Sequence, residues 1–178
     1  DLVLPPLTTG TVMASVGGAG STADGIATLD LPPGAVVRPD GTPYAGEVRV
    51  ELAALVPDAP RYLDAFAGEL RGLRLDGRDV PVVSHGLAAV RLAGAAGQVL
   101  DLDDARTATL TLAVAGDPGA APGTLPAWWF DPRAGEWREG PTGVRADDVY
   151  TTELTGVGTW HLGAPVDDLC RLAGVVED

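Results

Sequence analysis

The chain has 178 residues, of which 46% are hydrophobic and 5% aromatic, and its formal net charge is −13. This length suits one large domain or two small ones with a buried core, and the negative charge argues against nucleic acids and anionic membranes as partners. No run approaches the roughly 18 consecutive apolar residues of a membrane span, and Cys170, the only cysteine, excludes an internal disulfide and a thiolate metal site.

Two further features of the sequence bear on its origin. Every basic residue is Arg, and neither Lys nor Asn occurs. We interpret this bias as codon usage in a GC-rich bacterial genome. The chain begins at Asp1 without a Met or a signal-like segment, so we expect a processed product or a piece of a longer protein.

Short strands separated by turns are predicted along most of the chain. They fall in the ranges 25–36, 46–55, 73–83, 85–102, 107–114 and 148–163. The clearest is GEVRVELAAL (46–55), where Val48, Val50 and Leu52 alternate with charged residues and should face a core. The range 59–73 is ambiguous: Leu63, Phe66 and Leu70 have near-helical spacing, but a loop that leads into a strand fits the glycines equally well.

About ten short strands with turns every eight to twelve residues predict an all-β fold with little or no helix. An antiparallel β-sandwich fits this pattern, and two packed β-subdomains are the alternative. We expect an N-terminal extension over 1–9 and the sandwich over 10–168, with a loop or subdivision near 116–126. Residues 169–178 then begin a following β-domain or form a tail.

The stretch LPAWWFDPRAGEWREG (125–140) holds three of the four tryptophans, and DPRAG (131–135) is a predicted tight turn. Pairing across this turn should bring Trp129 near Trp137, with Trp128 and Phe130 on the other face. The four residues that we expect in one structural core are Trp128, Phe130, Trp137 and Trp160. The candidates for an exposed binding surface are Trp129, Tyr44 and Tyr62.

The spaced residues Pro126, Trp128, Phe130, Asp131, Gly135, Trp137, Glu139 and Gly140 resemble a hallmark of an extracellular β-module family. The family includes cartilage intermediate layer proteins and FAM171-type membrane proteins, and it occurs in many bacterial surface proteins. The ranges 41–55, 84–102 and 155–165 resemble further motifs of the family in the expected order, and 10–37 is similar to the start of ZU5 domains. DLCRLAGVVED (168–178) looks like the first strand of a carboxypeptidase-regulatory-like domain.

Related ZU5-type domains cleave themselves at a His-Phe-Ser sequence, which the resemblance aligns with Gly156, Val157 and Gly158. The nucleophile and its base are therefore both missing. Thr159 and His161, two residues further on, offer a shifted site, but a hydroxyl without a positioned base is a weak nucleophile at neutral pH. An autoproteolytic domain that has lost its site remains an alternative.

Metal and hydrolase chemistry have weak signals. His85 and His161 lack metal-ligand spacing, and no GxSxG elbow accompanies the three serines. The acidic run LDLDD (100–104) supplies Asp101, Asp103 and Asp104 as the best calcium candidates, because Ca²⁺ prefers carboxylate oxygens. Solvated loop acids are the simpler interpretation, and we expect no other cofactor.

The resemblance implies a non-catalytic structural or adhesive module of a secreted or cell-surface multidomain protein, not an enzyme. Its partners would be neighbouring domains of the same polypeptide, with a surface glycan or protein as a further partner. The alternative is a carbohydrate- or protein-binding module that uses exposed aromatic side chains.

Overall fold

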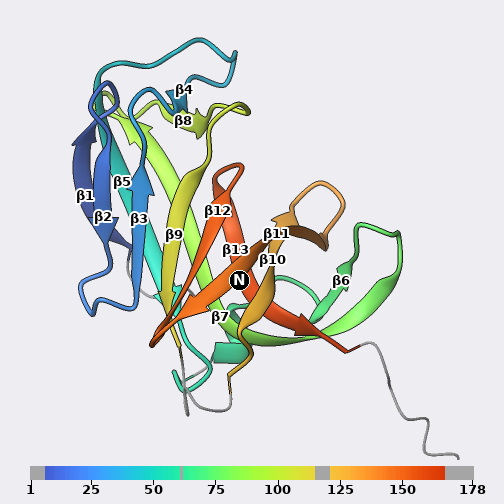
Figure 1. Cartoon of the computed structure of the whole chain (residues 1–178). Helices are drawn as coiled ribbons and strands as arrows, with labels where there is room; N and C mark the ends of the chain where they lie inside the picture. Colours follow the sequence, from blue (N-terminus) through green and yellow to red (C-terminus); the bar gives the residue numbers. More distant parts are fainter. Residues whose placement is uncertain (1–6, 61, 115–120, 167–178) are drawn as a thin grey trace, which may run out of the picture.

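Alternating apolar and polar residues produce antiparallel strands throughout the part of the chain that the computed structural model describes, residues 7–60, 62–114 and 121–166 (Figure 1). One short 3-10 helix, η1 (Tyr62–Ala65), interrupts them. The strands are β1 (Thr8–Met13), β2 (Gly18–Ser21), β3 (Ala27–Leu31), β4 (Val36–Val37), β5 (Glu47–Leu55), β6 (Arg71–Leu73), β7 (Asp79–Gly94), β8 (Val99–Leu102), β9 (Ala108–Ala113), β10 (Thr124–Asp131), β11 (Glu136–Ala146), β12 (Val149–Leu154) and β13 (Gly158–Pro165).

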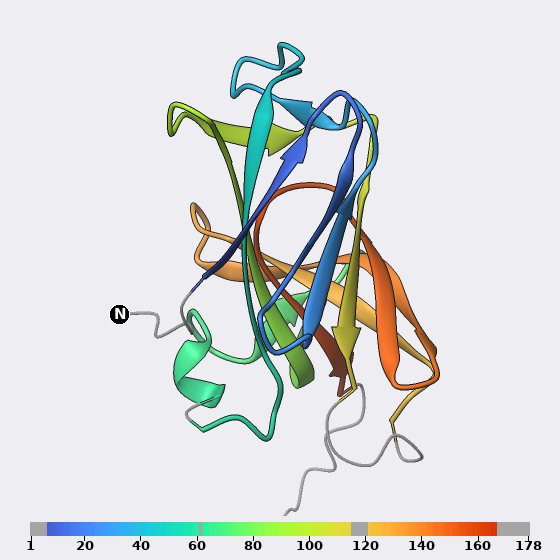
Figure 2. The same cartoon turned by 90° about the vertical axis from the view of Figure 1, so that its left-hand side faces the viewer.

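The strands form one continuous sheet in the order β1-β5-β7-β13-β10-β11-β12-β9-β3-β2, which folds over to make the two layers of a sandwich (Figures 1 and 2). The two ends of the sheet, β1 and β2, meet at the turn between them, where Met13 bridges Gly17. The predicted all-β antiparallel class is therefore confirmed. One pairing among the described strands is parallel, between β6 and β11.

The core between the layers is built mainly from Val, Leu and Ala side chains of both halves of the sheet, together with Tyr44, Tyr150 and Trp160. Val48, Val50 and Leu52 of β5 are buried in it, as their alternation predicts. Leu110 and Leu112 of β9 face them from the opposite layer. We call this cluster the inner core.

A second buried cluster lies on the outer face of the same sheet, where β7, β13 and β10 adjoin. Its buried residues are Tyr62, Ala65, Val80, Val82, Leu87, Trp128 and Trp137, with Leu55, Phe66 and Phe130 packed against them. The segment that holds η1 covers this face, so β13 is buried on both sides. We call this cluster the outer core.

The ambiguous range 59–73 is resolved as a short 3-10 turn followed by β6, with Gly68 at a positive φ between them. Thr8 and Thr9 pair with Leu52 and Glu51, so part of the expected N-terminal extension belongs to the sheet. The predicted loop 116–126 is described only from Ala121 onward, and β10 already begins at Thr124. The predictions for 169–178, including Cys170, lie outside the described residues.

The turn that joins the two ends of the sheet depends on Gly17. Its φ is 77°, and a Cβ there would overlap the Leu31 carbonyl oxygen and approach Pro33. Gly25 has a similar φ of 73° with no atom within 4 Å of such a Cβ. Both substitutions to Ala introduce left-handed strain of about 1–2 kcal/mol, and only Gly17→Ala must also displace backbone.

We therefore expect Gly17→Ala to lower the free energy of unfolding by roughly 1–3 kcal/mol more than Gly25→Ala does. Urea unfolding followed by tryptophan fluorescence measures both. Equal losses for the two variants would show that the close approach at Gly17 does not constrain the fold.

Candidate functional site

The β10–β11 hairpin closes at the predicted DPRAG turn, where Asp131 Oδ1 accepts the backbone N–H of Arg133 at 2.9 Å. Its register differs from the prediction by one residue. Phe130 lies opposite Trp137, and Trp129 lies opposite Arg138. The predicted pairing of Trp129 with Trp137 is wrong because Asp131 pairs with Glu136, which leaves four residues in the loop.

This register divides the four tryptophans between the two faces of the sheet. Trp128 and Trp137 are 0% and 1% exposed in the outer core, and Phe130 packs against them partly buried. Trp160 is 3% exposed in the inner core. The expectation of a single aromatic core is therefore wrong, because Trp160 lies opposite Trp129, whereas the adjacent His161 lies opposite Trp128.

Each of the three buried indoles donates its N–H to a backbone carbonyl. Trp128 Nε1 donates to Gly163 O at 2.9 Å, Trp137 Nε1 to Ala67 O at 3.0 Å and Trp160 Nε1 to Gly156 O at 3.1 Å. A buried N–H without a partner would cost about 1–3 kcal/mol. These bonds tie the covering segment and the loop before β13 to the sheet.

A chain of three polar groups crosses the outer core. The Tyr62 hydroxyl lies 2.7 Å from Ser84 Oγ, which lies 3.2 Å from His161 Nδ1. The His161 ring is 2% exposed and lies between aromatic rings, with its centroid 4.5 Å from that of Trp137 and nearly perpendicular to it. Trp128 stacks on it at 6.2 Å, and Phe66 meets it edge-on at 5.5 Å.

A β-bulge brings Ser84 and His161 together. Leu162 pairs with Gly86 but the next residue, Gly163, pairs with Ser84, so His85 has no opposite residue. The extra residue shifts the alternation of β7. Ser84 and Leu87 consequently lie on the same outer face, although they are three positions apart.

Burial lowers the pKa of His161 to about 3, because the charged imidazolium would lie among aromatic rings. Burial raises the pKa of Tyr62 for the same reason. A neutral imidazole carries one proton, and in either tautomer His161 Nε2 has no hydrogen-bond partner among the described residues. Burial therefore keeps the side chains of both Tyr62 and His161 in their neutral forms.

Two glycines make room for these rings. A Cβ at Gly163 would overlap Val82 Cγ1 and lie 2.8 Å from His161 Cε1, and one at Gly72 would overlap the ring of Trp128. Only a residue without a side chain fits at these two positions. The outer core therefore packs the large rings directly against backbone.

Nucleophilic catalysis receives little support from this arrangement. No carboxylate hydrogen-bonds His161 within the described residues, so the orienting third group of a Ser-His-Asp triad is missing there. Thr159 pairs with Ala89 in the regular part of β13, two residues before His161. His161 lacks metal-ligand spacing in the sequence, but strict alternation along β13 already places it on the opposite face from Trp160.

Two of the three predicted exposed aromatics are buried. Tyr44 is 9% exposed, and its hydroxyl donates to Glu47 O at 3.1 Å and accepts from Gln98 Nε2 at 3.3 Å. Tyr62 is 6% exposed within the outer core. Both expectations are wrong, because each ring fills a core and each hydroxyl finds a partner inside the protein. Trp129 remains partly exposed.

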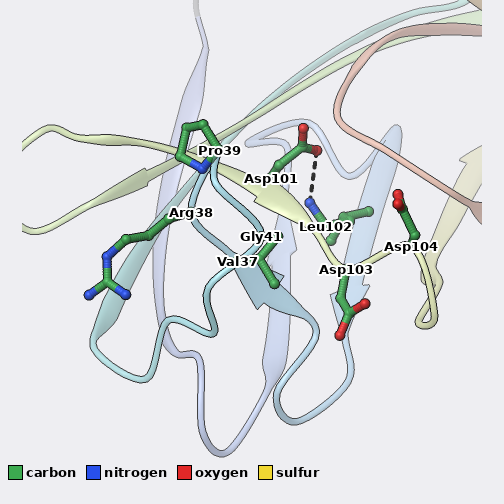
Figure 3. Close-up of a pocket in the computed structure, with 8 residues that line it drawn as sticks. All are labelled: Val37, Arg38, Pro39, Gly41, Asp101, Leu102, Asp103 and Asp104. Atoms are coloured by element: carbon green, nitrogen blue, oxygen red, sulfur yellow. Dashed lines mark hydrogen bonds between the residues drawn. The ribbon is translucent and has the colours of Figure 1, made fainter.

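The calcium candidates lie at a hollow of about 300 Å³ beside Arg38, Pro39 and Gly41, but their carboxylates point in different directions (Figure 3). Asp101 Oδ1 accepts the N–H of Leu102 at 2.8 Å, and Asp103 Oδ1 accepts that of Ala105 at 3.0 Å. Within the described residues, no three His, Cys, Asp or Glu side chains gather as metal ligands. The structure thus does not assemble Asp101, Asp103 and Asp104 into a calcium site.

Comparison with known proteins gives one informative match. The chain is 33% identical over 125 residues to cartilage intermediate layer protein 2 of Mus musculus, a match that covers 68% of this chain and 10% of the mouse protein. The matched part of the chain thus corresponds to about a tenth of the length of that relative. No family model and no solved structure matches the chain. The similarity supports a distant relationship, whereas the ZU5-like start and the bacterial origin stay predictions.

The depressed pKa of His161 makes stability depend on pH. The contribution of the neutral imidazole to the free energy of unfolding is complete above pH 6.5, the ordinary pKa of histidine. It is lost as pH falls toward 3, because the unfolded chain binds the proton more tightly than the folded protein does. We expect a loss of about 1.4 kcal/mol per pH unit inside this window. Chemical unfolding at several pH values between 6.5 and 4.5 measures it.

His161→Gln should flatten this slope, and His85→Gln is the control because His85 is only half-buried at the bulge. His85→Gln should keep most of the slope. An unchanged slope in His161→Gln would mean that the imidazole is not the group that titrates.

Truncation of Trp137 tests the outer core. Trp137→Ala removes its hydrogen bond to Ala67 O and its contact with His161, and should lower the free energy of unfolding by about 3–5 kcal/mol. Val144→Ala, at a residue 54% exposed, should change it by less than about 0.5 kcal/mol. Similar values for the two variants would contradict the structural role of Trp137.

Proposed function

We propose that this chain is a non-catalytic β-sandwich module of a secreted or cell-surface multidomain protein, where it spaces and supports neighbouring domains of the same polypeptide. The observation that carries the proposal is that three of the four tryptophans and His161 are buried and serve the packing of the protein. Trp128, Trp137 and Trp160 each bond a backbone carbonyl from a buried position, and His161 is neutral and enclosed by aromatic rings.

The two cores suit a load-bearing role. The sheet is covered on both faces at β13, and β13 pairs with β7 along one edge and with β10 along the other. A force that reaches β13 therefore acts on a strand that is hydrogen-bonded on both edges and packed on both sides. Tight packing of this kind resists deformation. Loops on such a frame are free to vary and to carry contacts with partners.

The similarity to cartilage intermediate layer protein 2 supports the same proposal. The name of that protein places it in the intermediate layer of cartilage, and the matched region is a tenth of its length. A module in a long extracellular chain is consistent with both facts. Within the described residues, moreover, no helix has the length and hydrophobicity of a transmembrane span.

The proposal predicts an uncleaved and inert chain. Purified protein of 178 residues should give a single intact mass after incubation for days at neutral pH, because Gly156, Val157 and Gly158 stand where the self-cleaving ZU5-type domains that the sequence resembles have His-Phe-Ser. It should also fail to hydrolyse generic ester, peptide and glycoside substrates.

Two outcomes would overturn it. The first is a pair of fragments that meet near Gly158 or Thr159. The second is turnover that disappears in His161→Gln but persists in His85→Gln, since this would assign a catalytic role to the buried imidazole.

A further inference from the structure

Trp129 differs from the other three tryptophans. It is partly exposed, and its indole N–H has no hydrogen-bond partner among the described residues, whereas the other three indoles each donate to a carbonyl. One side of the ring packs against the inner core, next to Trp160 on the neighbouring strand. The structure therefore holds this ring in place but leaves both an aromatic surface and a donor available.

A hollow of about 220 Å³ lies beside this ring. Three segments that are distant in sequence line it. The first contributes Asp101 in β8 and Asp104 just after that strand, the second contributes Trp129 on β10, and the third contributes the loop 155–157 and Trp160 of β13. No basic residue lines it. The hollow is smaller than the roughly 300–1,000 Å³ of drug-sized ligand sites, and it is open to solvent.

Hydrogen bonds fix the walls of the hollow before any ligand binds. Trp160 Nε1 donates to Gly156 O at 3.1 Å and secures the 155–157 loop. The Val157 N–H donates to Asp101 Oδ1 at 3.5 Å, which links this loop to the end of β8. Gly158, at a φ of 126°, leaves space for the indole, since a Cβ there would lie 3.1 Å from Trp129 Nε1. A site prepared in this way loses little entropy on binding.

The chemistry of the hollow selects among ligand classes. Asp104 is exposed, and its carboxylate has no hydrogen bond or ion pair within the described chain, so it is a free acceptor; Trp129 supplies a free donor and an aromatic face. Anions are disfavoured by the two carboxylates. A cation would use the carboxylates and the ring but not the N–H. A neutral polyol uses all three, because each hydroxyl both donates and accepts and the C–H face of a sugar ring is apolar.

We propose that this hollow is a binding site for a neutral glycan, in which one sugar ring stacks on Trp129 and its hydroxyls bond Asp104 and the indole N–H. Asp101 and Asp104 also line the neighbouring hollow beside Arg38, Pro39 and Gly41 (Figure 3). The two hollows are thus adjacent, and an oligosaccharide reaches both more readily than a single sugar does. Binding here is independent of whether the module also spaces other domains.

The test uses the 178-residue chain and a panel of uncharged oligosaccharides of three to six sugars, built from glucose, xylose, mannose, galactose or N-acetylglucosamine. Calorimetry and tryptophan fluorescence measure binding. We expect at least one member to bind, and Trp129→Ala to weaken that binding about tenfold or more. Asp104→Asn should weaken it less, because the amide oxygen remains an acceptor. Asp58→Asn is the control, because this exposed acid lines neither hollow.

Unfolding midpoints of all variants are measured in parallel, so that a loss of binding is separated from a loss of folding. If Trp129→Ala unfolds, Asp104→Ala decides the matter, because Asp104 is exposed and makes no contact that the fold requires. Three results overturn the proposal: no binding by any member at millimolar concentration, binding that survives both Trp129→Ala and Asp104→Ala, or binding of Arg- and Lys-rich peptides in place of the glycans.

Discussion

The burial of β13 on both faces is the constraint on which the rest of the structure depends. A strand with one solvent-exposed face would need only one set of apolar residues, but β13 places Trp160 and Leu162 in the inner core and His161 in the outer core. The outer face must therefore be covered, and η1 and β6 do so with help from the β10–β11 hairpin. The two cores share this sheet, so a substitution that disturbs the packing of one core should also disturb the packing of the other.

The polar chain Tyr62–Ser84–His161 is an unusual component of so apolar a cluster. Its members come from the covering segment, β7 and β13, and each reaches the next by a hydrogen bond. Buried polar groups in partly satisfied networks are costly, and His161 Nε2 is such a group. A hydrogen bond has a preferred direction, whereas an apolar contact has none. The bond between Tyr62 and Ser84 therefore fixes the orientation of η1 on the sheet. The same burial keeps the imidazole neutral by lowering its pKa.

The four tryptophans differ in whether the indole N–H donates a hydrogen bond within the described part of the chain. Three are committed to backbone carbonyls and serve packing. Trp129 retains its N–H beside two carboxylates at the rim of the inner core. In many β-sandwiches the packed sheets form a rigid frame, and the loops at one end of it carry the binding site. The similarity to cartilage intermediate layer protein 2 supports the proposal of a structural module, and the hollow beside Trp129 supports the proposal of a binding site.

The sequence by itself determined the fold class, because alternation such as that of Val48, Val50 and Leu52 depends only on the two-residue period of a strand. It also located the turn at 131–135 and the aromatic hairpin, whose signals are local. The tertiary structure alone decided which core each aromatic side chain joins. The register Phe130–Trp137 is set by the loop length, and the bulge at His85 moves Ser84 beside His161. The bulge has no local signal, because it depends on β13, the strand that lies opposite. The burial of Tyr44 and Tyr62 likewise depends on segments distant in sequence that pack over their rings, so the sequence did not predict the outer core.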